Sequence, residues 1–286
     1  MESLSGLAWV QADVFCEAPL GGNGLCVFRP DRSLDDDIML RLTQEMRQFE
    51  SIFLFPEGDD VRARIFTVEE ELDFAGHPLL GAAAVLHDAA PAAGERAAWR
   101  IRLNSRSVML STRRLRDRFY EAEMDQGVPL WGREAEGAAR AAVLEGLGLT
   151  EADLMPGLPL GMVSTGLDYL IVPVTPQGLA RAAIRVDDFE ARLETLGAKF
   201  AYLLDTANAE GRTWDNLGAV EDVATGSAAG PAGAYLHRHC GAPQAITLRQ
   251  GRFAGRPSRL SVTIDGDSGA VTVGGGVALL AEGRFY

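Results

Sequence analysis

Short apolar runs bounded by glycine, proline or charged residues recur along the chain, and most have the length of a β-strand. Several follow one another without an intervening helix, which predicts meander-like strands and few βαβ units. The runs predict strands over Trp9–Phe15, Ser51–Phe55, Val61–Phe66, Trp99–Leu103, Ser107–Thr112, Phe119–Met124, Gly161–Ser164, Tyr169–Val174, Phe200–Leu204, Ala245–Arg249, Arg259–Ile264 and Ala270–Val273.

Other segments have the spacing or composition of helices. Ser33 can cap a helix from Leu34 to about Phe49. Asp35, Asp36 and Asp37 then lie in its first turn, where the helix dipole favours negative charge. The remaining predicted helices are Pro78–His87, Glu134–Leu147, Asp187–Leu196 and a helix from Ser227 to about His239. Two of these, Pro78–His87 and the one from Ser227, are rich in small and apolar residues, as expected of buried helices.

The length of 286 residues fits about two domains, and a hydrophobic fraction of 47% can fill two cores. A linker is predicted around Gln126–Pro129. We therefore expect one domain over residues 1–127 and a second over residues 128–286, with the last strand able to cross back to the first domain.

The chain is acidic, with a net charge of −13 and a pI of about 4.8. Such a chain repels phosphate backbones, which argues against nucleic acid and anionic membranes as partners. No apolar run reaches the length of a membrane span, and the first seven residues lack the pattern of a signal peptide. The three cysteines have no Cys-x-x-Cys spacing, so we expect reduced thiols, a cytoplasmic location and no metal cluster.

Two turns with similar sequences carry the candidate chemistry. Glu221–Gly230 brings two acids into a small, glycine-bearing turn at the start of a helix, and Asp73–Pro78 is a second turn of this kind. Backbone N–H groups at such helix starts bind anions. The segments that begin at Gly76 and Gly226 are identical at their first, seventh, ninth and eleventh positions. This modest repeat predicts two related halves with a cleft between them.

These residues resemble the PhzF family, the phenazine-biosynthesis isomerase-like proteins related to diaminopimelate epimerase. Each motif is weak alone, but six in the same order are specific. The motifs are Asp13-Val14-Phe15 with Gly22-Asn23, Glu50-Ser51-Ile52-Phe53, Arg64-Ile65-Phe66-Thr67 leading to Phe74-Ala75-Gly76-His77-Pro78, Ser164-Thr165-Gly166, Glu221-Asp222-Val223-Ala224-Thr225-Gly226-Ser227, and Gln250-Gly251 with Gly255-Arg256-Pro257-Ser258.

The resemblance implies an α+β fold of two similar domains, each a curved, mostly antiparallel sheet wrapped around a central helix, with the active site between them. It implies a homodimer without a cofactor. The expected activity is that of an isomerase that moves a proton between carbons of a small cyclic or amino-acid-like carboxylate.

Glu50 matches the family's proton-shuttling glutamate. Without a metal or pyridoxal, a carboxyl group in a dry cleft can take and return a proton, because burial raises its pKa towards neutrality. Spacing alone would favour an exposed glutamate at a strand edge, and only the resemblance reverses that interpretation.

His77 matches the family's active-site histidine, although by itself a capping or core histidine is the more common case. Asp222 is the third candidate catalytic residue, since it could hold a substrate amine or hydroxyl. It could also simply satisfy the helix dipole. We expect Ser227 to bind a substrate carboxylate with the N–H groups of Gly226 and Ala228. Gly76 frames the opposite turn.

The sequence departs from the family at two positions where proline is usual, Gly24 and Val223. The second change loosens the turn after Asp222, because proline fixes φ. The turns carry no cysteine, which argues against the two-thiol mechanism of diaminopimelate epimerase. Arg256 could bind a carboxylate or lie on the surface.

Three hypotheses remain open at this point. The first is the cofactor-independent isomerase, the second an amino-acid racemase or epimerase of the same fold, and the third a catalytically silent small-molecule binding protein. Isotope exchange, chiral product analysis and ligand-induced thermal stabilisation without chemistry would separate them.

Overall fold

The computed structural model describes residues 4–58 and 60–286, and Met1, Glu2, Ser3 and Asp59 lie outside the described residues. The chain divides into two compact units. The first contains the described residues up to Asp125 together with Gly274–Tyr286, and the second contains Gln126–Val273. The segment 274–286 therefore belongs to the first unit, in keeping with the expectation that the last strand could cross back to the first domain.

The described residues of the first unit form nine strands, and most of their pairings are antiparallel. Their order is β1-β2-β3-β4-β6-β7-β8-β16, with β5 on β4, and β16 also pairs with β1, which closes the strands into a ring. The strands are β1 (Ala8–Val14), β2 (Asn23–Arg29), β3 (Glu50–Glu57), β4 (Asp60–Thr67), β5 (Glu71–Leu72), β6 (Arg96–Arg102), β7 (Ser107–Arg116), β8 (Phe119–Gly127) and β16 (Val271–Arg284).

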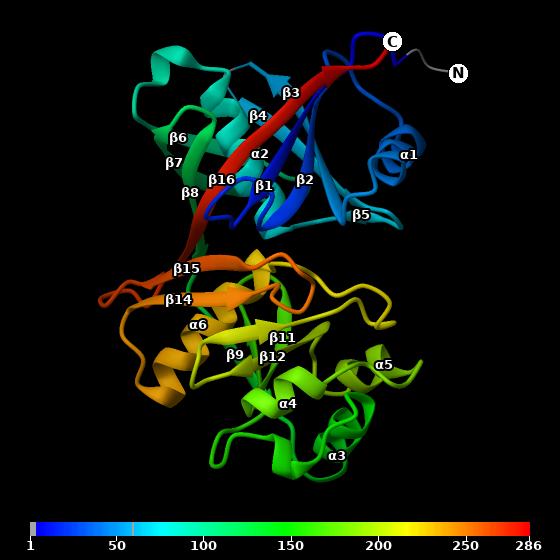
Figure 1. Cartoon of the computed structure of the whole chain (residues 1–286), viewed down its shortest axis with the longest axis vertical. Helices are drawn as coiled ribbons and strands as arrows, with labels where there is room; N and C mark the ends of the chain where they lie inside the picture. The colour runs from blue at the N-terminus through cyan, green and yellow to red at the C-terminus, as the bar shows by residue number, and fades with distance from the viewer. Residues whose placement is uncertain (1–3, 59) are drawn as a thin grey trace. The chain divides into compact units, whose positions relative to one another are not determined.

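Helix α2 (Gly76–Asp88) is the centre of this ring and contacts β1, β2, β3, β6 and β7 (Figure 1). Nearly all of its residues are buried, as its small, apolar composition requires. A Cβ at Gly81 would lie 2.3 Å from Leu25 Cδ2, so only glycine allows this approach of the helix to β2.

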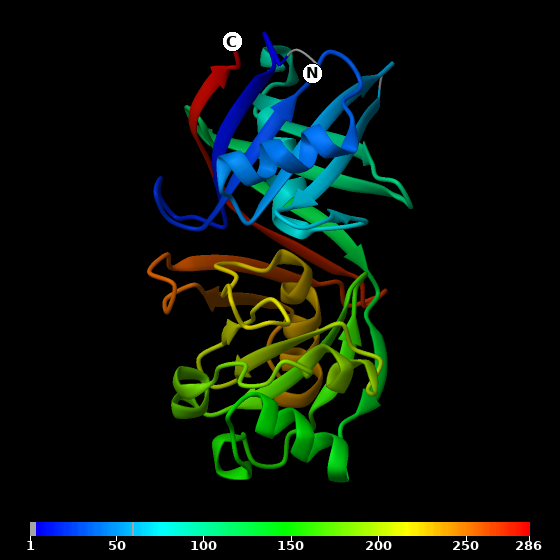
Figure 2. The same cartoon turned by 90° about the vertical axis from the view of Figure 1, so that its right-hand side faces the viewer.

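Helix α1 (Asp36–Met46) lies outside the strands, as Figure 2 shows. Its buried face, with Met39 and Leu42, packs on a core that includes the stacked rings of Phe28 and Phe53, whose centroids are 4.6 Å apart. A 3-10 turn, η1 (Pro91–Ala93), follows α2.

The second unit has the strand order β16-β15-β14-β13-β12-β11-β10-β9. Its strands are β9 (Leu130–Glu134), β10 (Gly161–Ser164), β11 (Asp168–Val174), β12 (Phe200–Asp205), β13 (Glu210–Arg212), β14 (Ala245–Gln250) and β15 (Ser258–Ile264). The pairs β11–β12 and β13–β14 are parallel, and the pairs β9–β10, β10–β11, β12–β13 and β14–β15 are antiparallel.

Helix α6 (Gly226–Cys240) takes the place in this unit that α2 takes in the first, and it contacts β10, β11, β12, β14 and β15. A Cβ at Gly233 would lie 2.5 Å from Val262 Cγ1, so small residues again allow a helix to lie close to strands. A separate core is formed with the short elements α3 (Gly137–Gly146), η2 (Glu151–Asp153), α4 (Pro176–Arg181) and α5 (Phe189–Glu194).

The observed elements correct several expectations. Helix α1 begins at Asp36 after Asp35, which is the N-cap, so the predicted cap at Ser33 is wrong. Asn23 and Gly24, residue types that are common in turns, begin strand β2, and β16 extends eleven residues beyond the predicted strand end at Val273, to Arg284. Within residues 4–58 and 60–286, no helix has the length and apolarity to cross a membrane.

Candidate active site

The ends of three elements of the first unit bring Glu50, His77 and Asn23 together. Glu50 is the first residue of β3, Asn23 is the first of β2, and His77 lies in the first turn of α2. The parallel pairing of β2 with β3 places Leu25 beside Glu50, so the starts of both strands lie at the same edge of the sheet. The helix inside the ring starts at that edge.

The three side chains are almost completely buried, with exposed fractions of 7% for Glu50 and 3% each for His77 and Asn23. His77 Nδ1 lies 3.4 Å from Glu50 Oε2 and 3.5 Å from Asn23 Nδ2. His77 Nε2 is buried and has no hydrogen-bond partner in the described part of the chain. Burial lowers the pKa of His77 to about 3, and a backbone contact with Gly24 acts in the opposite direction.

A neutral imidazole therefore adjoins a carboxyl group in a site that water hardly reaches. The neutral ring has one donor and one acceptor nitrogen, so it can pass a proton or orient a polar group without adding charge. This is the chemistry that general acid–base catalysis requires.

In the second unit, the loop before α6 holds Asp222 in a closed polar network. Asp222 is 7% exposed, and the Thr225 hydroxyl donates to its Oδ2 over 2.6 Å. The Gln250 amide donates to the Asp222 carbonyl oxygen and to Thr225 Oγ1, both at 2.8 Å. Its own oxygen accepts from Thr225 N–H at 3.2 Å and from the Tyr202 hydroxyl at 3.1 Å.

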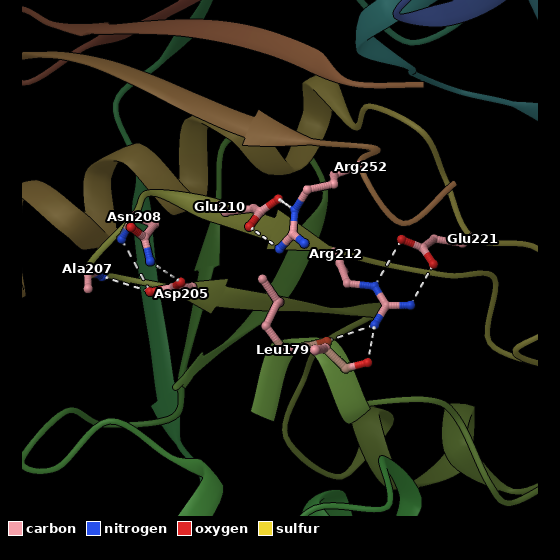
Figure 3. A network of polar contacts seen from close by, with 9 residues as sticks. Leu179, Asp205, Ala207, Asn208, Glu210, Arg212, Glu221 and Arg252 are labelled. Atoms are coloured by element: carbon pink, nitrogen blue, oxygen red, sulfur yellow. Dashed lines mark hydrogen bonds and ion pairs between the residues drawn. The ribbon is translucent and has the colours of Figure 1, made fainter. Parts of the chain in front are cut away.

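The residue before Asp222 is fixed by a buried arginine (Figure 3). Arg212 Nε and Nη2 donate to the two carboxylate oxygens of Glu221 at 2.9 and 2.6 Å, while Nη1 donates to the Leu179 carbonyl at 2.7 Å. The guanidinium also lies 4.5 Å from the Trp214 ring centroid and 4.3 Å from that of Phe253. The Arg212 guanidinium, fixed by these hydrogen bonds and ring contacts, therefore anchors the start of the Asp222 loop.

The start of α6 provides hydroxyl and amide groups. Ser227 Oγ lies 2.8 Å from the Tyr169 hydroxyl, with either atom able to donate. The Ala228 N–H donates to the Thr225 carbonyl at 3.1 Å, so the amide predicted to bind a carboxylate already has a partner. The N–H groups of Gly226 and Ser227 lie in the first turn of α6, where the helix has no preceding carbonyl group that could accept their hydrogen bonds.

At Gly24 and Val223, the two positions where the family usually has proline, the chain makes close local contacts. A Cβ at Gly24 would lie 2.4 Å from the Gln48 side-chain oxygen, so a larger residue there requires Gln48 to move. The Val223 carbonyl oxygen lies 2.6 Å from the position of a Cβ on Gly251, where φ is +82°. Gly251 thus lets the chain after β14 pass close to the loop. Arg256 closes that turn through its backbone, and its N–H donates to the Gly251 carbonyl at 3.0 Å.

The structure brings Glu50 and His77 together in the first unit and Asp222, Gly226, Ser227 and Ala228 together in the second. Gly76, the first residue of α2, is buried next to His77. That the two groups face one cleft stays a prediction. The described residues contain no group of three or more His, Cys, Asp or Glu side chains arranged to hold a metal ion.

Sequence reasoning assigned no role to Asn23, Thr225, Tyr169 or Gln250, all of which contact the predicted residues. Asn23, Thr225 and Gln250 lie inside the family motifs, so their polar side chains within those motifs could have marked them as candidates. Tyr169 had only its place at the start of an apolar strand.

Residues 12–283 match the family of phenazine biosynthesis-like proteins, PhzC-PhzF. The chain belongs to the PhzF family. It is 34% identical to trans-2,3-dihydro-3-hydroxyanthranilate isomerase from Pseudomonas aeruginosa, over 97% of this chain and 99% of that protein. Further relatives are named isomerases as well, and the chain is an isomerase of the PhzF family.

Solved structures agree with this assignment. A predicted epimerase from Pseudomonas aeruginosa is 50% identical, with a TM-score of 0.92, and the match covers 98% of this chain and 99% of that one. A PhzF-family phenazine biosynthesis protein from Bacillus anthracis has a TM-score of 0.82 at 22% identity, over 100% of both chains. The second likeness shows the fold, which is the two-domain α+β fold expected of the family.

Proposed function

We propose that this PhzF-family isomerase moves a proton between two carbons of a small cyclic, amino-acid-like carboxylate, with Glu50 as general acid and base and without a cofactor. The observation that carries the proposal is the buried pair of Glu50 and His77, with 3.4 Å between Oε2 and Nδ1. One relative is named for trans-2,3-dihydro-3-hydroxyanthranilate, which makes that compound the first candidate substrate.

In the proposed reaction, a C–H bond next to a conjugated system breaks and its proton passes to a Glu50 oxygen. The electron pair moves into the adjoining double bonds, and the same carboxyl group then protonates a different carbon. Atoms and charge balance without an oxidant. The neutral His77 ring orients the carboxyl group and the reacting part of the substrate.

The groups of the second unit supply binding in this proposal. Asp222 accepts a hydrogen bond from a substrate amine or hydroxyl. The Ser227 hydroxyl and the N–H groups of Gly226 and Ser227 bind the carboxylate, supported by the positive end of the α6 dipole. Gly76 leaves room for the substrate at the start of α2.

The test is isomerisation of the candidate substrate in heavy water by wild-type enzyme and by Glu50→Gln. We expect deuterium at carbon with the wild-type protein and a loss of turnover of about 10²–10⁴-fold in the variant. The matched control is Glu57→Gln, on the same strand but with a half-exposed side chain that contacts Arg102. Exchange at the wild-type rate in Glu50→Gln would remove Glu50 from the mechanism.

A second candidate is an epimerase, and the specific observation in its favour is the 50% identical structure described as a predicted epimerase. The same acid–base pair would return the proton to the carbon it left, on the other face. Chiral chromatography of the product separates the two functions, because the epimerase inverts one stereocentre and leaves the double bonds in place, whereas the isomerase moves a double bond.

We further propose a homodimer in the cytoplasm. The described cysteines are all free thiols, which suits a reducing compartment. Light scattering after size exclusion tests the assembly, and a mass of one chain at micromolar concentration would contradict it.

A further inference from the structure

Gln250 occupies a position where all four hydrogen-bonding sites of a carboxamide are used. It is 1% exposed, and its partners are the Asp222 carbonyl, the Thr225 hydroxyl, the Thr225 N–H and the Tyr202 hydroxyl. An amide offers two donors and two acceptor sites, so the set is complete. Three of the four contacts are to the loop that carries Asp222.

The partners fix the direction of every bond in the network. Complete burial raises the pKa of Tyr202, so its hydroxyl keeps its proton and donates to Gln250 Oε1. The Thr225 N–H is a donor and also requires Oε1. The amide nitrogen must then be the atom that faces the Asp222 carbonyl and Thr225 Oγ1.

The direction of the hydrogen bond between Thr225 and the Asp222 carboxylate follows from the Gln250 contacts. Because Thr225 Oγ1 receives a hydrogen from Gln250, its own hydrogen is directed elsewhere, and Asp222 Oδ2 lies 2.6 Å away. That distance is typical of an O–H···O⁻ bond to a charged acceptor. A relay therefore runs from Tyr202 through Gln250 and Thr225 to one oxygen of Asp222.

We infer that Gln250 and Thr225 are positioning residues of this isomerase: they fix the rotation of the Asp222 carboxylate and hold it in its charged, accepting form. The inference rests on the proposed role of Asp222 in binding the substrate. It specifies that the substrate group at this point is a hydrogen-bond donor such as an amine, because a relay ending in a donated hydrogen favours an acceptor carboxylate.

The first experiment is a double-mutant cycle on turnover of trans-2,3-dihydro-3-hydroxyanthranilate. Thr225→Val keeps the shape of the side chain and removes the hydroxyl, while Thr225→Ser retains it. We expect Thr225→Val to lower kcat/KM roughly ten- to hundred-fold and Thr225→Ser to restore most of it, since hydrogen bonds to charged groups are the strong ones. In the Asp222→Asn background, Thr225→Val should cost less than about two-fold, because the two residues act together.

The second experiment needs no substrate and measures amide hydrogen exchange of the full chain. Gln250→Leu removes all four bonds, so we expect amides in the 222–226 segment to exchange at least about ten-fold faster while those of α2 are unchanged. If Gln250→Leu does not fold, Gln250→Glu preserves the shape and, when ionised, loses both donors.

The outcomes separate the inference from the function on which it rests. Full activity in Asp222→Asn contradicts the proposed role of Asp222 itself. Loss of activity in Asp222→Asn with wild-type turnover in Thr225→Val overturns the relay alone. An equal loss of kcat/KM on Thr225→Val in both backgrounds also overturns the inference, because it shows a structural contribution only. Unchanged hydrogen exchange at 222–226 in the Gln250 variant contradicts the claim that Gln250 positions the loop.

Discussion

Replacing Arg212 by methionine tests whether the buried ion pair holds the second unit together. The side chains of Arg212 and Glu221 are 9% and 15% exposed. Methionine preserves much of the apolar stem between Trp214 and Phe253 and removes the guanidinium. Glu221 then keeps a charge in a site that solvent barely reaches, and the Leu179 carbonyl loses its donor.

The expected cost follows from that unpaired charge. Breaking a buried ion pair by removing one partner costs about 3–5 kcal/mol of unfolding free energy. The lost bond to the Leu179 carbonyl is part of this figure and is not added to it. At room temperature such a change lowers the folding equilibrium constant by a factor of roughly 10²–10³ or more.

Urea unfolding followed by tryptophan fluorescence and circular dichroism measures the effect. Trp131 and Trp214 lie in the second unit and report on it. The control is Arg113→Met, which breaks a pair with Glu121 in which both side chains are 38% exposed. That variant should lose much less unfolding free energy than Arg212→Met, because exposed pairs contribute little.

A double variant, Arg212→Met with Glu221→Met, isolates the cause. It should be more stable than Arg212→Met alone, because no buried charge is left without a partner. The reasoning is refuted if Arg212→Met costs no more than the surface control, or if the double variant loses the sum of both single changes.

Three further outcomes are expected. Because burial lowers the pKa of His77 to about 3, the unfolded chain binds a proton below pH 6.5 that the folded chain does not. The unfolding free energy should therefore fall by up to about 1.4 kcal/mol per pH unit from about pH 6.5 to 3, and His77→Gln should flatten this slope. Gly81→Ala should cost about 1–3 kcal/mol, because its Cβ would lie 2.3 Å from a leucine methyl on β2. A thiol reagent at pH 8 should label Cys240 in the native protein but not Cys16 or Cys26, whose pKa values burial raises to about 11 and 12.

Each of these has its own contrary result. An identical pH slope in His77→Gln assigns the dependence to other groups. Gly161→Ala, where a Cβ would meet ordinary contacts at 3.9 Å, is the matched control for Gly81→Ala, and equal stability of both variants contradicts the packing explanation. Rapid native labelling of more than one thiol contradicts the burial of Cys16 and Cys26.

The sequence pattern located most strands and the two central helices, because alternation and small-residue runs are local signals. It did not locate β2 or the length of β16. Strand β2 begins with Asn23 and Gly24, which are typical turn residues, yet the apolar run after them is paired on both sides, with β1 and β3. In β16, three consecutive glycines follow the predicted strand Ala270–Val273, and pairing with β1 extends the strand beyond them.

The candidate site divides in the same way. Glu50, His77 and Asp222 were predicted because they lie in motifs whose order along the chain is specific. The partnership of Gln250 with Tyr202 joins residues that are 48 positions apart, on strands β14 and β12. Their proximity depends on the arrangement of the strands in the sheet, which no local pattern specifies.

The pairing of β1 with residues 277–284 has a consequence for biosynthesis. A ribosome delivers the amino-terminal half first, yet the strand that seals its ring emerges last. The intervening residues 126–273 are continuous in sequence and form a compact unit of their own. During synthesis, the second unit should therefore fold before the first unit is completed, because β1 obtains its partner strand only after residues 126–273 have been made.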